Sequence, residues 1–284
     1  MEGEQDYEFV DQHGTVHTGR AAKEKILNVN DLRFVSDEGI VAIDKKRWSL
    51  AQSYERRTWL ARGLSSRDDR NIFHFNCFGR YEILRGRSFL NAIEIGCGPF
   101  TNLRLIQRVA EIATCDLLDP LINDYIRHPY CYYDENRLYG CGSTTFEAKI
   151  RKVLHKPLMR ISRFSRDFVP INRIISTPLE DMNVDQRYDL IVMINVIEHC
   201  YNVDEIFDRL LSLSKPDTVF VFHDVFFDEL SVREKSQYLY DTGHPLRLGE
   251  KKLRRDLLCY FDAKLQREEV GSYHKKIWFI GERK

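Results

Sequence analysis

A glycine turn at residues 92–100 contains the residue types needed to bind a charged ligand. The stretch reads AIEIGCGPF and completes a short apolar run. Glycines let a ligand approach the backbone closely, and the amides at the start of a following helix can meet its polar groups. Glu94 stands two residues before Gly96, where a carboxylate would repel a phosphate and attract a cation. The pattern therefore predicts a site for a ligand that carries positive charge.

A dinucleotide site is the main alternative for this turn. The pattern G-x-G-x-x-G, read from Gly96, requires a third glycine at position 101, where the sequence has Thr101. Because the pyrophosphate pattern is incomplete and Glu94 lies beside it, the turn disfavours a dinucleotide.

A second acid follows the glycine turn at a useful distance. Asp119, in the stretch CDLLDPL, ends the second predicted strand. An acid about 20 residues after such a turn can accept hydrogen bonds from both hydroxyls of a ribose. Asp116 is the weaker candidate for this role, and a carboxylate after a strand also commonly stabilises a turn.

Three histidines near predicted strand ends are candidates for acid–base chemistry. They are His199 in VIEHC, His223 in FHD and His244 in DTGHPL. An imidazole can take a proton from a hydroxyl group, although each histidine could instead make a fixed structural hydrogen bond. No carboxylate cluster predicts a metal ion, since Asp224 and Asp228 have the pattern of solvated loop acids. We expect no metal.

One face of a predicted N-terminal helix, over residues 45–64, combines aromatic and polar side chains. Trp48, Gln52, Glu55 and Trp59 recur at i, i+4, i+7 and i+11. Aromatic residues at this spacing usually pack in a core, but buried polar groups between them require partners. We therefore expect this face to close over the active site.

The elements that position these residues alternate along the chain. Strands are predicted at residues 88–95, 112–118, 171–176, 188–194, 218–223, 264–270 and 276–280. Helices are predicted at residues 45–64, 68–84, 99–109 and 203–213. Alternating strands and helices indicate a parallel sheet, whereas the short linker between the last two strands requires an antiparallel pair. The predicted fold class is α/β, a Rossmann-like mostly parallel sheet with an antiparallel C-terminal hairpin.

The predicted domain organisation has two parts. Residues 1–86 form a mostly helical N-terminal cap region, and residues 87–284 form the ligand-binding domain. A long basic and aromatic stretch at about residues 123–170 is interpreted as an insertion after the second strand.

Four motifs in order give the chain a family resemblance. EIGCGPF, DLLDPL, STPLEDM and YDLIVMINVIEH resemble those of class I S-adenosylmethionine (SAM)-dependent methyltransferases, in the branch that modifies small molecules and sugars. The resemblance runs from about residue 87 to the C-terminus, without the insertion. It departs from the family at Phe100, where a third small residue is common.

The resemblance implies SAM as the cofactor and assigns the residues that would bind it. The methionine end of SAM would contact Glu94, Gly96, Cys97, Gly98 and Asn195. The ribose would contact Asp119. The adenine would contact Pro120, Leu179 and Glu180.

The amino-acid composition limits the classes of partner and the cellular location that we expect. The 43 basic and 43 acidic residues cancel, so the chain does not build the broad positive field that nucleic acid rewards, and nucleic acid is disfavoured. No apolar run is long enough to span a membrane, and the N-terminus does not resemble a secretory signal. Seven irregularly spaced cysteines favour a reducing, cytoplasmic location. The oligomeric state does not follow from the sequence.

We expect O-methylation of a small molecule or of a sugar or glycan-linked hydroxyl. Two alternatives remain. A tRNA or protein methyltransferase draws weak support from the basic stretch at residues 149–166. A SAM-binding accessory subunit without activity is disfavoured, because Glu94, Gly96 and Asp119 are all present.

Overall fold

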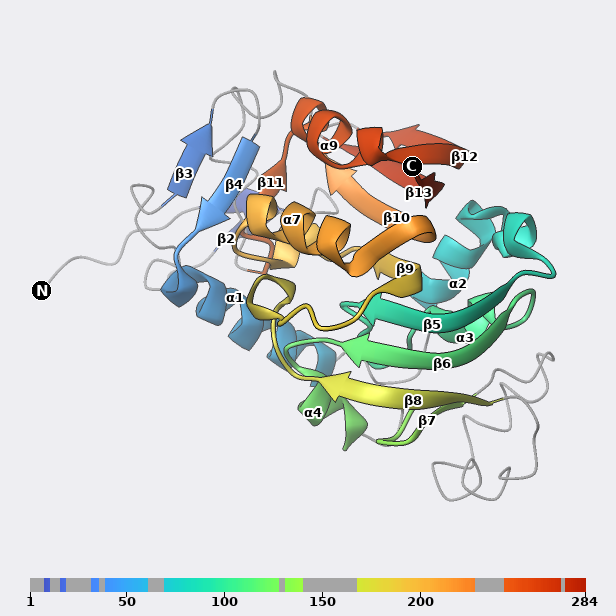
Figure 1. The fold of residues 1–284 in the computed structure, drawn as a ribbon. Helices are drawn as coiled ribbons and strands as arrows, with labels where there is room; N and C mark the ends of the chain where they lie inside the picture. The colour runs from blue at the N-terminus through green and yellow to red at the C-terminus, as the bar shows by residue number, and fades with distance from the viewer. Residues whose placement is uncertain are drawn as a thin grey trace, which may run out of the picture.

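The computed structural model centres on an eight-stranded β-sheet (Figure 1). It describes residues 8–10, 16–18, 32–35, 39–60, 69–127, 131–139, 168–227, 243–271 and 274–284. The strands of the sheet are, in spatial order, β12 (Phe261–Val270), β13 (Lys275–Arg283), β10 (Ser214–Phe226), β9 (Tyr188–Ile194), β5 (Ser88–Ile95), β6 (Glu111–Leu118), β8 (Phe168–Ile175) and β7 (Arg137–Tyr139). The five strands from β10 to β8 are parallel, whereas β12, β13 and β7 pair antiparallel. The predicted fold class is confirmed.

The central strands are buried on both faces because their side chains are almost all apolar. Successive side chains of a strand point to opposite faces. Ile93 and Ile191 therefore belong to the core on one face, and Ala92 and Val192 to the core on the other. Parallel strands of this kind require helices on both sides.

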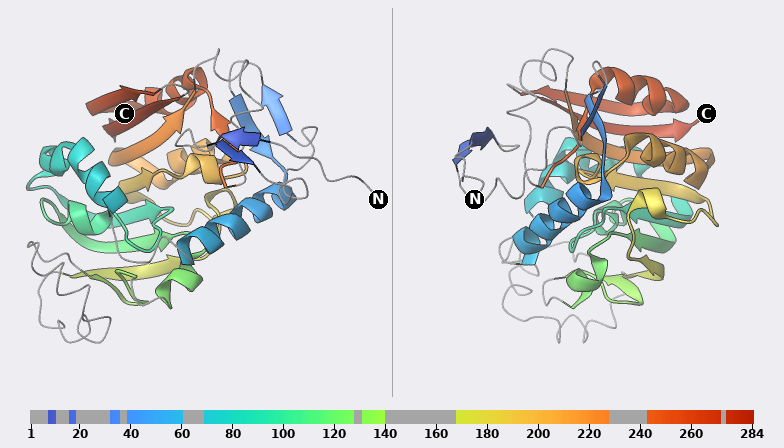
Figure 2. Two further views of the ribbon diagram at one scale, coloured as in Figure 1. Left: turned by 180° about the vertical axis from the view of Figure 1, so that it is seen from behind. Right: turned by 90° about the vertical axis from the view of Figure 1, so that its left-hand side faces the viewer.

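Helices cover both faces of the sheet (Figure 2). On the first face lie α7 (Val203–Leu213) and α9 (Glu250–Asp256). On the second lie α2 (Asp69–Cys77), the 3-10 helix η4 (Gly79–Leu84), α3 (Leu103–Ile106) and α4 (Ile122–Ile126). At the start of α7, the side chain of Asn202 accepts hydrogen bonds from the Asp204 and Glu205 amides. Such a cap satisfies amides that have no partner within the helix.

Helix α1 (Lys45–Thr58) lies across the carboxyl ends of the parallel strands, whose arrowheads point toward it in Figure 1. Its exposed ends are held by ion pairs. Lys45 pairs with Asp181 at 2.9 Å, and Arg56 pairs with Asp124 at 2.7 Å. The helix thereby covers the sheet edge at which ligands of α/β proteins bind.

A small sheet joins the N-terminal region to a late segment of the chain. It orders β11 (Arg247–Leu248), β4 (Gly39–Ile43) and β3 (Leu32–Val35), and β1 (Glu8–Val10) pairs with β2 (Val16–Thr18) separately. Gly39 has φ +91°, and a β-carbon there would lie 1.8 Å from the Arg247 carbonyl oxygen. Only glycine permits this pairing, which holds the segment around Arg247 against β4.

Several predicted elements differ in length from the observed ones. The helix predicted at residues 99–109 shortens to α3, because residues 96–102 form the turn. The helix predicted at residues 68–84 is instead α2, which ends at Cys77, followed by η4, in which Gly79, Arg80 and Tyr81 have positive φ. The strand predicted at residues 218–223 extends over the whole of β10.

The insertion and the cap region are described only in part. Within residues 123–170, the structure describes most of α4, then β7 and the start of β8, and residues 140–167 lie outside the described residues. The cap region contributes four short strands besides α1, α2 and η4. None of the described helices is long and apolar enough to cross a membrane.

Candidate active site

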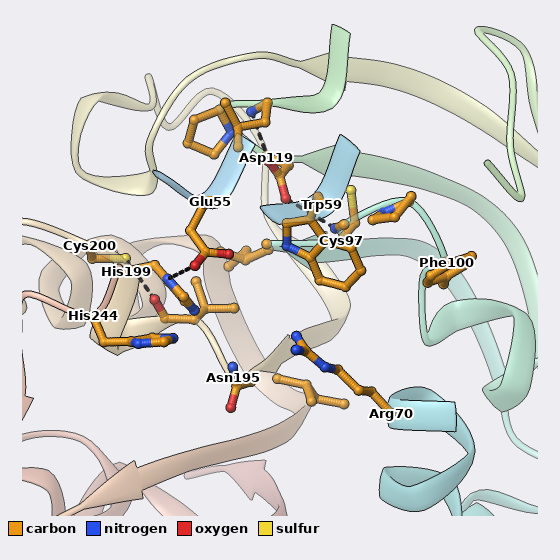
Figure 3. Close-up of a pocket in the computed structure, with 18 of the residues that line it drawn as sticks. Glu55, Trp59, Arg70, Cys97, Phe100, Asp119, Asn195, His199, Cys200 and His244 are labelled. Atoms are coloured by element: carbon orange, nitrogen blue, oxygen red, sulfur yellow. Dashed lines mark hydrogen bonds and ion pairs between the residues drawn. The ribbon is translucent and has the colours of Figure 1, made fainter. Parts of the chain in front are cut away.

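A cavity of about 680 Å³ lies between α1 and the carboxyl ends of the parallel strands (Figure 3). The face of α1 with Trp48, Gln52, Glu55 and Trp59 lines it. The helical spacing of these four residues thus corresponds to a surface that faces the cavity.

Ten of the twelve predicted site residues line this cavity. They are Gly96, Cys97, Gly98, Asp119, Pro120, Leu179, Asn195, His199, His223 and His244. Glu94 and Glu180 are not among its lining residues, which differs from the prediction.

The glycine turn brings the backbone of residues 96–98 to the cavity wall. Gly96 has φ +64°, and a β-carbon there would lie 2.4 Å from the side chain of Val196. Gly98 has φ +52°, but a β-carbon there would meet no atom within 4 Å. Gly96 is therefore required by the protein's own packing, whereas the space beside Gly98 is left open to a ligand.

Glu94 stabilises the turn from behind. Its carboxylate accepts hydrogen bonds from the Thr101 hydroxyl and from the amides of Asn102 (2.7 Å) and Leu103 (3.2 Å). The side chain is buried, and burial raises its pKa despite these hydrogen bonds. We expected it to line the methionine end of SAM, but the backbone amides at the start of α3 occupy it.

Asp119 links the glycine turn to the cavity. Its carboxylate accepts hydrogen bonds from the amides of Leu121 (2.8 Å) and Gly98 (3.1 Å). Burial raises the pKa of Asp119 to about 6. Each carboxylate oxygen retains a further lone pair, so hydroxyl donors in the cavity can still bind it. Asp116, the weaker candidate, accepts hydrogen bonds from Arg173 and from the hydroxyl of Tyr188 and is not a lining residue.

Glu180 also holds backbone amides. It lies in the 3-10 helix η6 (Leu179–Asp181) and accepts hydrogen bonds from the amides of Tyr201 (2.7 Å) and Asn202 (3.1 Å). Burial raises its pKa. Its neighbour Leu179 lines the cavity, whereas the contact of Glu180 with adenine stays a prediction.

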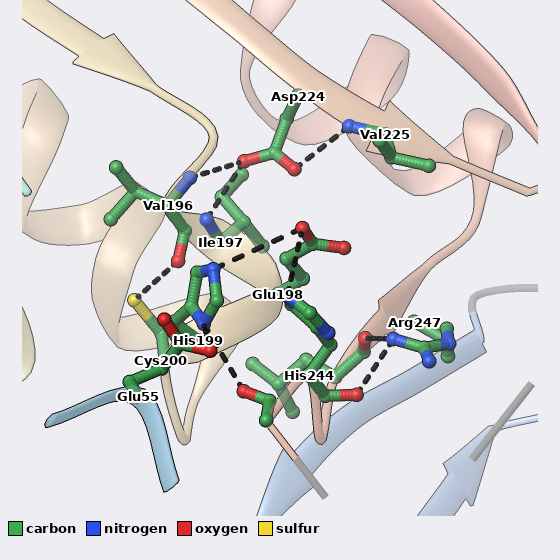
Figure 4. Close-up of polar contacts among 12 residues, drawn as sticks. Glu55, Val196, Ile197, Glu198, His199, Cys200, Asp224, Val225, His244 and Arg247 are labelled. Atoms are coloured by element: carbon green, nitrogen blue, oxygen red, sulfur yellow. Dashed lines mark hydrogen bonds and ion pairs between the residues drawn. The ribbon is translucent and has the colours of Figure 1, made fainter. Parts of the chain in front are cut away.

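Glu55, His199 and His244 form a cluster at one side of the cavity (Figure 3). The Glu55 carboxylate lies 4.0 Å from Nδ1 of His199. The centroids of the His199 and His244 rings are 4.5 Å apart. Behind them, Oε1 of Glu198 lies 3.9 Å from Nε2 of His199 and 3.6 Å from Nε2 of His244 (Figure 4). Two carboxylates thus flank two imidazoles.

The main chain around His199 is held firmly. The side chains of Trp48 and Gln52 both donate to its carbonyl oxygen at 3.0 Å. Asp224 accepts hydrogen bonds from the amides of Val196 and Ile197 at 3.1 and 2.7 Å. Asp224 is fully buried, and burial raises its pKa to about 7. It is therefore a positioning residue and not the solvated loop acid that we expected; Asp228 lies outside the described residues.

A second pair of histidines lies on another side of the cavity. His223 is 2% exposed, and its ring nitrogens have no hydrogen-bond partner among the described residues. Its ring lies 4.3 Å from that of His74, whose Nδ1 accepts from the indole of Trp278. Burial lowers the pKa of His223 well below its usual value and that of His74 to about 4. Both rings are neutral near pH 7, so His223 is suited to hydrogen bonding and poorly suited to hold a proton.

Phe100 has a structural partner that explains its departure from the family pattern. Its ring packs edge-on against Trp59, with centroids 6.1 Å apart. The guanidinium of Arg70 lies over the ring of Trp59, 5.1 Å from its centroid. The sequence analysis gave no role to Arg70, His74 or Glu198; of these, only Glu198 lies within a quoted motif, YDLIVMINVIEH.

A family model supplies the assignment. The model for the methyltransferase domain matches residues 69–264. The chain belongs to the methyltransferase-domain family. The predicted family is thereby confirmed, and the protein is a SAM-dependent methyltransferase. A comparison with curated proteins finds no significant match.

Solved structures of methyltransferases have similar folds. The N-methyltransferase NodS from Bradyrhizobium japonicum WM9, in complex with S-adenosyl-L-homocysteine, is 14% identical with a TM-score of 0.48, covering 82% of this chain and 98% of that one. A SAM-dependent methyltransferase from Leishmania major is 14% identical with a TM-score of 0.46, covering 99% and 98%. Magnesium protoporphyrin IX methyltransferase (ChlM) from Synechocystis PCC 6803, with bound SAM, is 11% identical with a TM-score of 0.46, covering 82% and 97%.

Proposed function

We propose that this methyltransferase transfers a methyl group to a hydroxyl of a small molecule, with a sugar or glycan-linked hydroxyl as the favoured acceptor. One observation carries the proposal. A single cavity joins the glycine turn and Asp119 to a cluster of two imidazoles and a carboxylate. The first group suits a nucleoside-containing donor, and the second suits an acceptor that must lose a proton.

The residues on the donor side fit SAM. Asp119 offers carboxylate lone pairs to the ribose hydroxyls, and the open space beside Gly98 admits a ligand against the backbone. Pro120 and Leu179 supply apolar surface for the adenine, and Asn195 and Cys97 line the region expected to hold the methionine. When bound, SAM supplies an electrophilic methyl group on a sulfonium centre.

The acceptor side orients a hydroxyl and draws its proton away. Glu55, His199 and His244 present carboxylate and imidazole groups to the cavity, and these accept hydrogen bonds from a hydroxyl. His223 also lines the cavity, but both of its ring nitrogens are buried in the protein.

Helix α1 contributes by restricting water and fixing geometry. Trp48 and Trp59 provide apolar surface on either side of Glu55, and the bond from Gln52 keeps the His199 main chain in place. Methyl transfer depends mainly on the alignment of donor and acceptor, so a rigid wall of this kind contributes directly to rate.

The test is transfer of a labelled methyl group from SAM to panels of free sugars, nucleotide sugars and oligosaccharides. We expect the label to appear in a small product as a base-stable ether, and Asp119→Ala protein to give none. Label that entered only tRNA or protein, and that nuclease or protease released, would overturn the proposed acceptor class. Label on an amine nitrogen would overturn the proposed atom.

We also propose a cytoplasmic location. The six described cysteines are free thiols, and five of them are buried. This usage is typical of proteins in a reducing compartment.

A further inference from the structure

We propose that Arg70 and Lys276 bind an anionic group, a phosphate or a carboxylate, on the methyl acceptor. The acceptor class is thereby narrowed from small molecules in general to acidic ones, such as sugar phosphates, nucleotide sugars and uronic acids. The inference rests on the proposed function for the small-molecule acceptor, whereas the binding of an anion by these two side chains can be measured without any methyl transfer.

Arg70 extends toward the cavity from the first turn of α2 (Figure 3). Its guanidinium lies over the ring of Trp59, 5.1 Å from the centroid, and it makes no hydrogen bond or ion pair with the described residues. A guanidinium held against an aromatic face keeps the N–H groups at its edge available. Arg70 can therefore donate two parallel hydrogen bonds to a phosphate or a carboxylate.

Lys276 lines the same cavity from β13. Side chains two residues apart in a strand share a face, so Lys276 lies on the face of Trp278, whose indole donates to Nδ1 of His74 at 3.1 Å. His74 follows Arg70 by four positions on α2, so these two side chains share a face of that helix. Burial lowers the pKa of His74 to about 4, and the positive charges of Arg70 and Lys276 add to this effect. The two cations therefore lie on one wall of the cavity.

The carboxylates that line the cavity lie elsewhere. Asp119 accepts the amide of Gly98 in the glycine turn, and Glu55 lies beside His199. Nζ of Lys276 is 3.6 Å from the carboxylate of Glu269, in a pair whose side chains are 31% and 48% exposed. A partly exposed contact at this distance is weak and is readily exchanged for a ligand. Both cations thus remain available to an anion in the cavity.

The charge balance of the cavity favours an acidic acceptor. Arg70 and Lys276 supply two positive charges, and ionised Glu55 and Asp119 supply two negative ones. SAM brings a sulfonium, an ammonium and one carboxylate, so its binding leaves one excess positive charge. A neutral sugar would leave this charge without compensation in a partly enclosed site, whereas a phosphate or carboxylate on the acceptor balances it.

The test measures anion binding to protein saturated with S-adenosyl-L-homocysteine, which fills the donor site together with its own carboxylate. Inorganic pyrophosphate and glucose 6-phosphate are titrated by calorimetry, with glucose as the uncharged comparison. We expect saturable binding of at least one anion and none of glucose. Arg70→Gln and Lys276→Gln should each weaken it about 10-fold, because hydrogen bonds to charged groups are the stronger class.

Arg85→Gln and Lys264→Gln are the matched controls. Each removes the same charge from a residue outside the cavity lining, where Arg85 pairs with Glu82 and Lys264 with Glu282. Their anion affinity should equal that of the wild type. Thermal melts by circular dichroism show which variants fold, and only folded variants are compared. Equal affinity in all four variants would overturn the proposal, as would no saturable binding of either anion by the wild type.

The carboxylate of SAM is the alternative occupant for Arg70. Binding of S-adenosyl-L-homocysteine is therefore compared with that of methylthioadenosine, which lacks the amino-acid part. If Arg70→Gln weakened only the first of these and left pyrophosphate binding unchanged, Arg70 would hold the donor carboxylate and the proposal would be wrong. The methylated atom does not enter these titrations, so transfer to an amine would overturn the proposed function and leave the anion site standing.

Discussion

Asp119 has two roles that its burial brings into conflict. Its carboxylate accepts a hydrogen bond from the amide of Gly98 and so closes the turn. It also lines the cavity, in which we expect hydroxyl donors. Burial raises its pKa to about 6, the charge of Glu55 adds to this, and the amides of Leu121 and Gly98 oppose it. Because the folded pKa lies above the usual 3.8, this group favours the folded state below about pH 4. That contribution is lost as pH rises through 6.

The affinity for SAM should depend on pH in the opposite sense. Ionised Asp119 is the better acceptor for ribose hydroxyls, so we expect affinity to fall about 10-fold from pH 7.5 to pH 5, one unit below the pKa. Calorimetry across this range measures it. Asp119→Asn should bind SAM weakly and with little pH dependence between 5 and 7. An equal slope in this variant would assign the titration to another group.

The two glycines of the turn should separate folding from binding. We expect Gly96→Ala to lose the most stability, because left-handed backbone costs about 1–2 kcal/mol and Val196 adds a clash. Gly98→Ala should lose only the stability that the left-handed backbone costs. Relative to that loss, it should weaken SAM binding more than Gly96→Ala does, since its methyl group enters the open space. Urea unfolding and calorimetry measure the two effects. The reverse ranking of stabilities would contradict this account.

At the scale of elements, α1 connects the cover of the cavity to the chemistry beneath it. Its side chains at Trp48 and Gln52 reach the His199 carbonyl, while Glu55 reaches the imidazole of the same residue. One helix face therefore sets both the main-chain position and the charge environment of His199.

Removal of the Gln52 side chain tests this arrangement. Gln52→Ala should lower stability by only about 0.5–1.5 kcal/mol, the usual net value of one hydrogen bond. It should lower kcat several-fold with little change in SAM affinity, because His199 loses alignment. Steady-state kinetics and urea unfolding give the comparison. Ser53→Ala is the control, since Ser53 is exposed and its hydroxyl donates to the Ser49 carbonyl within α1. Equal losses in both variants would remove the positioning role.

The sequence predicted the buried elements well and the irregular ones poorly. Residues 88–95, 188–194 and 203–213 have the predicted bounds, because long apolar runs between turn residues admit few alternatives. The helix after Pro99 is shorter than predicted because Glu94 holds the amides of Asn102 and Leu103 in the turn. That long-range use of a carboxylate leaves no local pattern.

The candidate site follows the same division. The glycine turn and the histidines at strand ends could be found because topology brings strand ends together. The cluster of Glu55, His199 and His244 could not be found, because its members come from three distant segments.

At the scale of the whole molecule, Gly39 allows β4, from the N-terminal region, to pair with β11, from a late segment of the chain. This pairing positions His244, which lies just before β11. Gly39→Ala should cost far more stability than Gly86→Ala. Both glycines have positive φ, but only Gly39 would place a β-carbon against backbone, at 1.8 Å from the Arg247 carbonyl oxygen. Gly39→Ala should also lose methyl transfer in the fraction that remains folded. Equal stability losses, measured by urea unfolding, would show that β4 and β11 can separate freely.

The two ion pairs at the ends of α1 have a consequence for how ligands exchange. Lys45 and Arg56 are 64% and 53% exposed, so each contact contributes little to stability and weakens with salt. The buried contacts to His199 in the middle of the helix are not screened in this way. We therefore expect product to leave past the helix ends, at a rate that rises with ionic strength, while the residues around His199 keep their alignment.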